Sequence, residues 1–303
     1  MLAVAAIWWL RPHAAVVDER MQVGVLGAGF TTLSSGRIVE LDREGEIRAR
    51  KSLGVEGDVR LVGTRLGTAV GWLEGRQLTL ATLDAAGRPD RIEHWGTNVV
   101  ALCDGVATNQ DRFAIGWLDA SGGVHAVDGW LATMSVVTAP STWCGIASAG
   151  RRIVLLSREG SGLYMNFCGD RACDGRFLRV PFDRSDELLG YGCLRDSCLF
   201  ALRDGTGRTW LRHVTEQGRL RAWLISDASP LTAFAIVAVG VRAFAIAYAG
   251  GDGASTVQRL ELDGTRTELA TFGGAVPALA WSAGKLLVAR PPASFSVLDV
   301  PAT

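Results

Sequence analysis

The sequence is poor in lysine and has no excess of either charge. Lys51 and Lys285 are its only lysines, and 31 basic residues, almost all arginine, balance 31 acidic ones among 303 residues. Proteins that bind nucleic acids need a basic surface to neutralise phosphates. The charge balance therefore predicts that nucleic acid is not a partner.

Segments that would separate domains or cross a membrane are missing as well. The chain has no Pro/Ser-rich linker, no block of like charge and no low-complexity stretch, so we expect one domain over residues 14–303. The most apolar internal stretch, residues 230–249, contains Gly240 and Arg242. These residues favour two buried strands joined by a tight turn over a membrane-spanning helix.

Motifs of catalysis and cofactor binding are also lacking. There is no Gly-x-Ser-x-Gly elbow, phosphate-binding loop or His-Glu-x-x-His pair, and the four histidines are scattered without metal-ligand spacing. The run from Val23 to Phe30 begins like a dinucleotide-binding fingerprint, but Thr32 stands where the third glycine is needed. We expect no cofactor and no metal, and enzymatic activity is less expected than binding.

The chain does contain a repeat. A short apolar run recurs seven times, in steps of 39, 45, 39, 46, 45 and 42 residues, with its middle at Leu33, Trp72, Trp117, Leu156, Leu202, Ala247 and Ala289. A period of this size indicates a solenoid, a propeller or an array.

Each repeat contains short β-rich runs separated by turn residues. The clearest unit, residues 58–97, has four such runs, bounded by Gly, Asp or Arg-Pro. The second run is often continuously apolar, as in Phe113–Trp117 and Phe244–Tyr248, which is typical of strands buried on both faces. Four strands in about 43 residues predict one antiparallel blade.

This pattern resembles β-propeller repeat proteins, without the Gly-His and Trp-Asp pairs of WD40 repeats. The resemblance covers nearly all of residues 14–303 and implies an all-β fold, a seven-bladed propeller of four-stranded antiparallel blades. It rests on spacing, so no functional residues are carried over. The last repeat has only three strands, and we expect residues 14–20 to pair with residues 295–300 and complete that blade.

The amino-terminal residues 1–13 are apolar up to Leu10. Their length matches the hydrophobic part of a signal peptide, although no basic segment precedes it and no clean cleavage site follows. We interpret them as the remnant of a signal or anchor segment, which implies a tether to a membrane. An apolar tail lying against the propeller is the alternative.

The six cysteines of the sequence bear on the location of the protein. Cys168 with Cys173, and Cys193 with Cys198, each flank a hairpin turn at C-x4-C spacing, so two local disulfides are expected. Cys103 and Cys144 lie on inner strands of adjacent blades with offsets that differ by about three residues, which leaves a third bridge open. Reduced cysteines and a zinc site are the alternatives. Disulfides would place the protein outside the cytoplasm, in the periplasm, at the cell surface or secreted.

These observations favour a non-enzymatic binding or scaffold module that recognises a protein or a glycan. Binding residues are often found on loops of a rigid scaffold. The loop positions we select are Asp119, Arg158, Asp204, Arg208 and Asp252. The alternative is a propeller enzyme acting on carbohydrate, a glycoside hydrolase or a sialidase-like protein. It would need two carboxylates about 5 to 9.5 Å apart across the channel.

If the two C-x4-C hairpins are oxidised, the untreated, denatured protein should contain at most two free thiols. Each bridge closes a short loop and stabilises the fold by about 2 kcal/mol in the chain-entropy model. Losing one should lower the unfolding temperature without abolishing folding. A thiol titration that finds all six free, or zinc bound in stoichiometric amount, would contradict this expectation.

Overall fold

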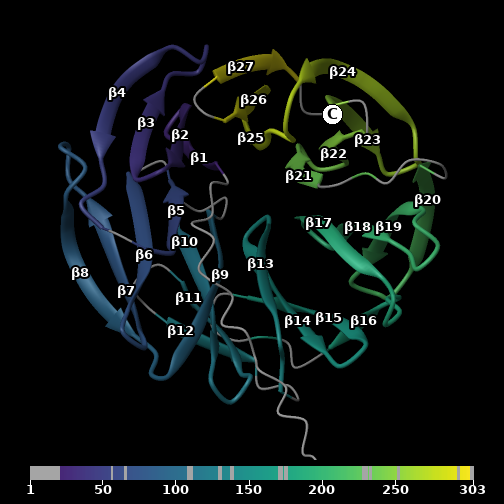
Figure 1. Ribbon diagram of the computed structural model, residues 1–303, viewed down its shortest axis with the longest axis horizontal. Helices are drawn as coiled ribbons and strands as arrows, with labels where there is room; N and C mark the ends of the chain where they lie inside the picture. The colour runs from purple at the N-terminus through teal and green to yellow at the C-terminus, as the bar shows by residue number, and fades with distance from the viewer. Residues whose placement is uncertain are drawn as a thin grey trace, which may run out of the picture.

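Seven antiparallel sheets stand like blades around a central axis in the computed structural model (Figure 1). The described residues are 21–55, 57–64, 67–107, 112–128, 132–136, 140–169, 173, 177–226, 231, 234–250, 253–291 and 294–300. We number the blades 1 to 7 in chain order. The resemblance to β-propellers is thereby confirmed, and seven blades are present as the repeat predicts.

Each blade begins at the channel and continues outward. The innermost strands are β1 (Gln22–Leu26), β5 (Val59–Gly63), β9 (Val99–Ala107), β13 (Cys144–Ala149), β17 (Glu187–Leu194), β21 (Phe234–Val239) and β25 (Ala278–Ser282). The second strands are β2 (Gly29–Ser34), β6 (Thr68–Glu74), β10 (Phe113–Asp119), β14 (Arg152–Glu159), β18 (Ser197–Arg203), β22 (Ala243–Ala249) and β26 (Lys285–Arg290).

The outer half of each blade follows in the same order. The third strands are β3 (Arg37–Leu41), β7 (Gln77–Leu83), β11 (Val124–Asp128), β15 (Gly162–Cys168), β19 (Thr209–Thr215), β23 (Ala254–Glu261) and β27 (Ser294–Asp299). The outermost strands are β4 (Ile47–Ser52), β8 (Pro89–Trp95), β12 (Ala132–Val136), β16 (Leu178–Val180), β20 (Leu220–Ser226) and β24 (Arg266–Gly273).

Within the described residues, blade 7 has three strands, β25, β26 and β27. The strand expected to complete it, residues 14–20, lies outside the described residues, as do residues 1–13. The first described strand, β1, belongs to the sheet of blade 1.

The second strands are buried on both faces, as their continuous apolar sequences predict. β10 is buried from Phe113 to Leu118, and β18 from Ser197 to Leu202. Residues 234–249 form β21 and β22, which confirms the two-strand reading of that apolar stretch. No helix in the described part of the chain is long and apolar enough to cross a membrane.

The apolar core is divided into seven clusters, and each lies between two adjacent blades. The cluster between blades 4 and 5 contains Phe167 and Phe200, one from each blade. The cluster between blades 7 and 1 joins Leu287 to Met21 and Phe30. Packing therefore closes the ring even where no sheet continues from one blade to the next.

Turn chemistry is shared by several hairpins. In the loops that begin at Asp42 and Asp84, the aspartate carboxylate accepts hydrogen bonds from the backbone N–H groups two and four residues later. The fourth residue of each loop is a glycine, Gly45 or Gly87, with φ of 89° or 84°. Asp-x-x-Gly is thus a structural signature of these turns.

All six cysteines are paired. Cys168–Cys173 and Cys193–Cys198 close the hairpins predicted from spacing, with Cα atoms 3.8 and 4.0 Å apart. The third bridge joins Cys103 on β9 to Cys144 on β13, with Cα atoms 5.2 Å apart, and so links blades 3 and 4. No described cysteine is free.

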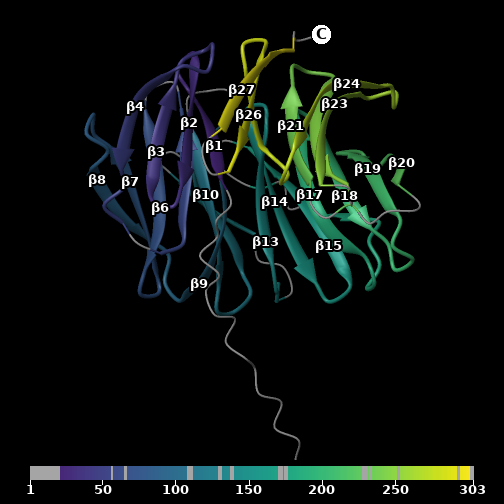
Figure 2. The same ribbon diagram turned by 45° about the horizontal axis from the view of Figure 1, so that its top comes forward.

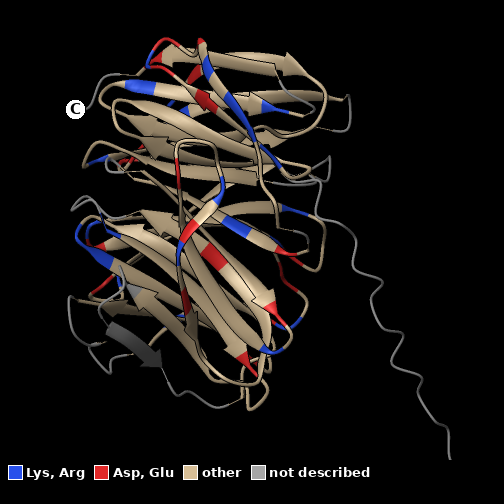
Figure 3. Ribbon diagram, turned by 90° about the vertical axis from the view of Figure 1, so that its left-hand side faces the viewer, with Lys and Arg blue, Asp and Glu red and all other residues tan. Residues whose placement is uncertain are grey.

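The strands run between two faces of the ring, which the tilted view shows (Figure 2). We call the face at which the innermost strands begin the entry face, and the face at which they end the exit face. On the side of the ring that Figure 3 draws, basic and acidic positions are interspersed along the strands and turns.

Candidate functional site

The channel holds two cavities that meet inside the ring. The cavity at the entry face measures about 830 Å³ and the one at the exit face about 1340 Å³. Both are lined by the same residues in mid-channel, among them Val23, Val106, Ser148, Cys193 and Val237. The channel therefore has two mouths, which we treat separately.

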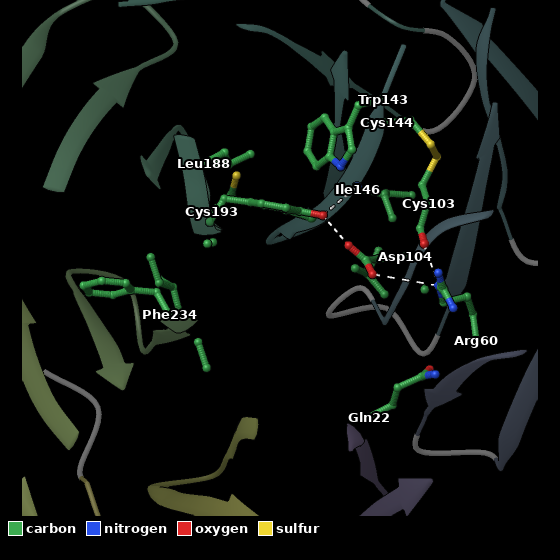
Figure 4. A pocket seen from close by; sticks show the side chains of 18 of the residues that line it. Gln22, Arg60, Cys103, Asp104, Trp143, Cys144, Ile146, Leu188, Cys193 and Phe234 are labelled. Atoms are coloured by element: carbon green, nitrogen blue, oxygen red, sulfur yellow. Dashed lines mark hydrogen bonds and ion pairs between the residues drawn. A yellow bond between two sulfur atoms is a disulfide. The ribbon is translucent and has the colours of Figure 1, made fainter. Parts of the chain in front are cut away.

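The entry mouth contains a cluster of Arg60, Asp104 and Tyr191. Figure 4 labels Arg60 and Asp104 in this cluster. A bulge in β9 places Asp104 there, because Cys103 and Asp104 together lie opposite Gly116 of β10. Bulges redirect side chains in this way. The Asp104 side chain is 55% exposed, whereas that of Arg60 is only 15% exposed.

The side chain of Tyr191 on β17 extends past β13 and reaches the carboxylate of Asp104 on β9. Its hydroxyl donates a hydrogen bond to Asp104 and accepts one from the N–H of Ile146 at 3.3 Å. Gly145 makes room, since a Cβ there would lie 2.6 Å from the hydroxyl oxygen. Burial, and then the charge of Asp104, raises the pKa of Tyr191 well above its usual value of 10.0.

Arg60 binds the backbone of the neighbouring blade. Its Nε donates to the Cys103 carbonyl at 2.6 Å and lies 4.0 Å from a carboxylate oxygen of Asp104. Its Nη1 also forms an ion pair with Asp58. One blade away, the Gln22 amide donates to the Val59 carbonyl at 2.6 Å and accepts from the Leu61 N–H at 2.8 Å.

Aromatic side chains complete the mouth. The ring of Trp143 meets that of Tyr191 edge to face, with centroids 5.9 Å apart. The guanidinium of Arg158 lies over the ring of Phe182, 5.0 Å from its centroid. Phe234 lines the opposite wall (Figure 4).

Among the described lining residues of this cavity, two carry carboxylates, and each has a partner. Asp104 is bound by Tyr191 and Arg60, and Glu187 is paired with Arg203, whose Nε lies 3.1 Å away. Among the described residues, no three His, Cys, Asp or Glu side chains gather as metal ligands would. The arrangement therefore offers a braced surface of aromatic and charged groups.

Two of the loop residues selected from sequence form hydrogen bonds that stabilise the turns in which they lie. Asp119 accepts hydrogen bonds from Ser121, Gly123 and His125 at 2.6 to 2.9 Å. Burial would raise the pKa of Asp119, but these hydrogen bonds outweigh it and hold that pKa well below the usual range.

Asp204 behaves in the same way. Hydrogen bonds from the Thr206 hydroxyl and the Trp210 indole lower its pKa to about 2. Both aspartates thus follow the Asp-x-x-Gly turn chemistry seen at Asp42 and Asp84.

Of the five selected residues, Arg158 is the one that lines the entry cavity. Asp119, Asp204 and Arg208 lie in turns of the entry face and do not line either cavity, and the Arg208 side chain is exposed. Asp252 lies outside the described residues.

Sequence reasoning missed Arg60, Asp104 and Tyr191. The structure shows the irregularity: β9 spans nine residues and β17 eight, whereas β5 and β1 span five each. Extra length in one repeat of a regular series indicates a bulge, and bulges occur near functional sites. Nothing in the spacing indicates that Tyr191, two blades away, reaches the same point.

Solved structures share the fold but little sequence. The WD40 domain of Neurospora crassa Pan2 aligns with a TM-score of 0.59 and 10% identity, over 94% of this chain and 89% of that chain. BBS1N, solved in complex with ARL6DN, aligns with a TM-score of 0.58 and 13% identity, over 91% and 88%. Kluyveromyces lactis Hsv2 aligns with a TM-score of 0.52 and 9% identity, over 84% and 85%.

No family model matches the sequence, and no curated protein is similar to it. At these identities the structural similarities establish the β-propeller fold alone.

Tyr191→Phe should destabilise the protein by about 1–3 kcal/mol at neutral pH, because it removes a hydrogen bond to a carboxylate and leaves the Ile146 N–H without its partner. The raised pKa adds a pH dependence. Above pH 10 the unfolded chain loses the Tyr191 proton while the folded protein keeps it, so this contribution to stability falls as the pH rises.

Denaturant unfolding between pH 8 and 11 should therefore show the gap between wild type and Tyr191→Phe narrowing above pH 10. Tyr164→Phe, which removes a hydroxyl from blade 4, corrects for the general effect of the substitution. Parallel stability curves for wild type and Tyr191→Phe would contradict the assigned environment.

Proposed function

We propose that this β-propeller is a non-enzymatic binding module that recognises a protein or a glycan at its entry mouth. The observation that supports this most is the combination of Trp143, Phe234, Arg158 and Asp104 around one cavity. Aromatic residues and arginine supply most of the energy in protein recognition sites. Aromatic faces also stack on sugar rings.

Rigidity of the rim supports the same proposal. The Cys103–Cys144 bridge and the Tyr191–Asp104 hydrogen bond tie blades 3, 4 and 5 together directly beneath the mouth. A surface fixed before binding loses little conformational entropy when the ligand arrives. BBS1N, solved in complex with ARL6DN, is a precedent for partner binding by this fold.

The hydrogen bonds and ion pairs that hold the two carboxylates of the entry mouth favour binding over glycoside hydrolysis. Hydrolysis requires one carboxyl group that donates a proton and a second that attacks or activates water. Here Asp104 and Glu187 are each held by an arginine or a hydroxyl of the protein itself. A carbohydrate-active enzyme is therefore the second candidate.

The loop residues selected from sequence extend the proposed surface. Asp119, Asp204 and Arg208 lie in turns on the same face as the entry mouth, and Arg158 lines it. In this proposal Arg158 and Arg208 contact the ligand, and the two aspartates hold the turns in shape. Asp252 stays a candidate from sequence.

We also propose an oxidising location outside the cytoplasm. Three disulfides support it, because such bonds persist in secreted and periplasmic proteins and are rare in the cytosol. Attachment to a membrane through residues 1–13 belongs to the same proposal.

The entry mouth is tested with the double variant Trp143→Ala/Arg158→Ala and the full oxidised chain as reference. Both proteins are immobilised and exposed to a glycan array and to a cell-envelope extract of the source organism. Loss of an aromatic and an arginine anchor should weaken capture of the same ligand by about 30-fold or more. Arg242→Ala, an exposed arginine of the exit face, should bind as wild type does.

Circular dichroism should first show that all three proteins are folded. A ligand that the double variant retains at wild-type affinity would refute the entry mouth as the binding surface. Release of labelled sugar from a captured glycan would instead favour the enzyme.

Completion of blade 7 by residues 14–20 is a further part of the proposal. Residues 295–298 of β27 are half-buried, whereas the outermost strand β20 is exposed along most of its first five residues. Met21, directly after the proposed strand, packs in the cluster between blades 7 and 1. An uncovered β27 edge would be a site for aggregation.

Two truncations test the closure. Removing residues 1–12 should leave a soluble protein, because the proposed strand is kept. Removing residues 1–21 should lower the unfolding temperature or cause aggregation, since it exposes the β27 edge. Because the longer truncation also removes Met21, Met21→Ala in the full chain serves as the control. Equal behaviour of the two truncations would contradict the closure.

A further inference from the structure

The two mouths of the channel differ in charge. The entry mouth is lined by charges of both signs, Arg60 and Arg158 with Asp104 and Glu187. At the exit mouth, the charged side chains among the described lining residues are Arg151, Arg152 and Arg195, and none is acidic. A cavity with walls of low polarity and charges of one sign concentrates the field of those charges.

Two adjacent turns bring these arginines together. Gly150 and Arg151 form the turn between β13 and β14, and Arg195 lies in the turn between β17 and β18. The turns touch, since a Cβ on Gly150 would lie 3.8 Å from the Cα, Cβ and Cγ atoms of Arg195. Arg151 and Arg195 are exposed, and the described residues provide neither with a carboxylate partner.

Arg152 has a different role. Its two terminal nitrogens bind the Glu216 carboxylate at 2.7 and 2.9 Å, and Nη2 also donates to the Arg195 carbonyl at 2.9 Å. The guanidinium lies over the Phe167 ring, 4.9 Å from its centroid. Its charge is therefore already compensated, and it fixes the backbone from which Arg195 projects.

Blades 6 and 7, next to the arginines, contribute apolar residues to the exit mouth. Val241, in the turn between β21 and β22, is 68% exposed and lines the cavity. Trp281 on β25 of blade 7 also lines the cavity, and its indole N–H donates a hydrogen bond to the Val300 carbonyl at 3.0 Å. An exposed valine and a half-buried tryptophan on two adjacent blades offer contact surface for hydrocarbon.

We propose that the exit mouth binds an anion that carries an apolar group, with Arg151 and Arg195 holding the charged head and Val241 and Trp281 contacting the apolar part. Guanidinium groups match the geometry of carboxylate and phosphoryl oxygens and bind them through charge-assisted hydrogen bonds. A concave, mostly apolar cavity with a few convergent polar groups is the usual form of a small-molecule site. This site is independent of the ligand proposed for the entry mouth.

Isothermal titration calorimetry of the full oxidised chain with four probes tests the proposal. Octanoate and octylphosphonate carry both features, acetate has only the charged head, and octan-1-ol has only the chain. We expect saturable binding of octanoate, octylphosphonate or both, with acetate and octanol at least about tenfold weaker. Whichever of octanoate and octylphosphonate binds more tightly identifies the charged group that the site prefers, a carboxylate or a phosphoryl group. Binding should weaken as salt is raised, because the arginines are exposed.

The double variant Arg151→Ala/Arg195→Ala should lose at least about tenfold in affinity. Arg242→Ala, which lies in the same turn as Val241 but outside the cavity lining, is the matched control and should bind as wild type. Val241→Asp places a negative charge on the apolar wall of an exposed turn and should weaken binding without unfolding the protein. The entry variant Trp143→Ala/Arg158→Ala should keep its affinity for these probes.

Thermal unfolding establishes that every variant is folded. The proposal is overturned if neither anion binds, if the double arginine variant binds as tightly as wild type, or if acetate or octanol matches octanoate. Equal affinity of wild type and Val241→Asp overturns it as well.

Discussion

The fold depends on innermost strands of neighbouring blades that lie close together without sharing a β-ladder. Where they meet, backbone approaches backbone, and Gly63 and Gly190 show how closely. A Cβ on these residues would lie 2.5 Å from the Val25 carbonyl oxygen and 2.6 Å from that of Phe234. Glycine is therefore needed there for space. No ladder crosses these contacts, and single backbone hydrogen bonds such as Gly27 N–H to the Thr64 carbonyl are joined by side-chain links between blades.

Those links run through blades 1 to 5 in succession and converge at the entry mouth. Gln22 joins β1 to β5, Arg60 joins β5 to β9, and the Cys103–Cys144 bridge joins β9 to β13. Tyr191 then connects β17 to both β13 and β9. The side chains that link blades 1 to 5 are thus the same ones that shape the cavity. A rigid mouth follows from the way the ring is closed, and a substitution there changes stability and the binding surface together.

The sequence predicts the fold well because each repeat carries its own signal. Blade number, the doubly buried second strands and both hairpin disulfides follow from spacing and local pattern, as at Phe113–Leu118 and Cys193–Cys198. The side-chain cluster at the entry mouth does not follow from spacing or local pattern, because it depends on contacts between blades. Arg60, Asp104 and Tyr191 come from three repeats, and the β9 bulge sets their meeting point. Spacing alone left the Cys103–Cys144 pair uncertain, since that bulge alters the offset between their strands.

The difference between patterns within one repeat and contacts between blades also explains why the loop aspartates are conspicuous in the sequence. Asp119 and Asp204 occupy the Asp-x-x-Gly pattern, which recurs because hairpins of this length need an acceptor for two N–H groups and a glycine with positive φ. A residue that recurs at equivalent turns serves the fold that all blades share. A binding surface specific for one ligand needs side chains that differ from blade to blade around the axis. Trp143, Arg158, Arg151 and Arg195 all lie in blades 4 and 5 or directly before them, so these two blades contribute to both mouths. Asp104 and Phe234 at the entry mouth, and Val241 and Trp281 at the exit mouth, come from other blades.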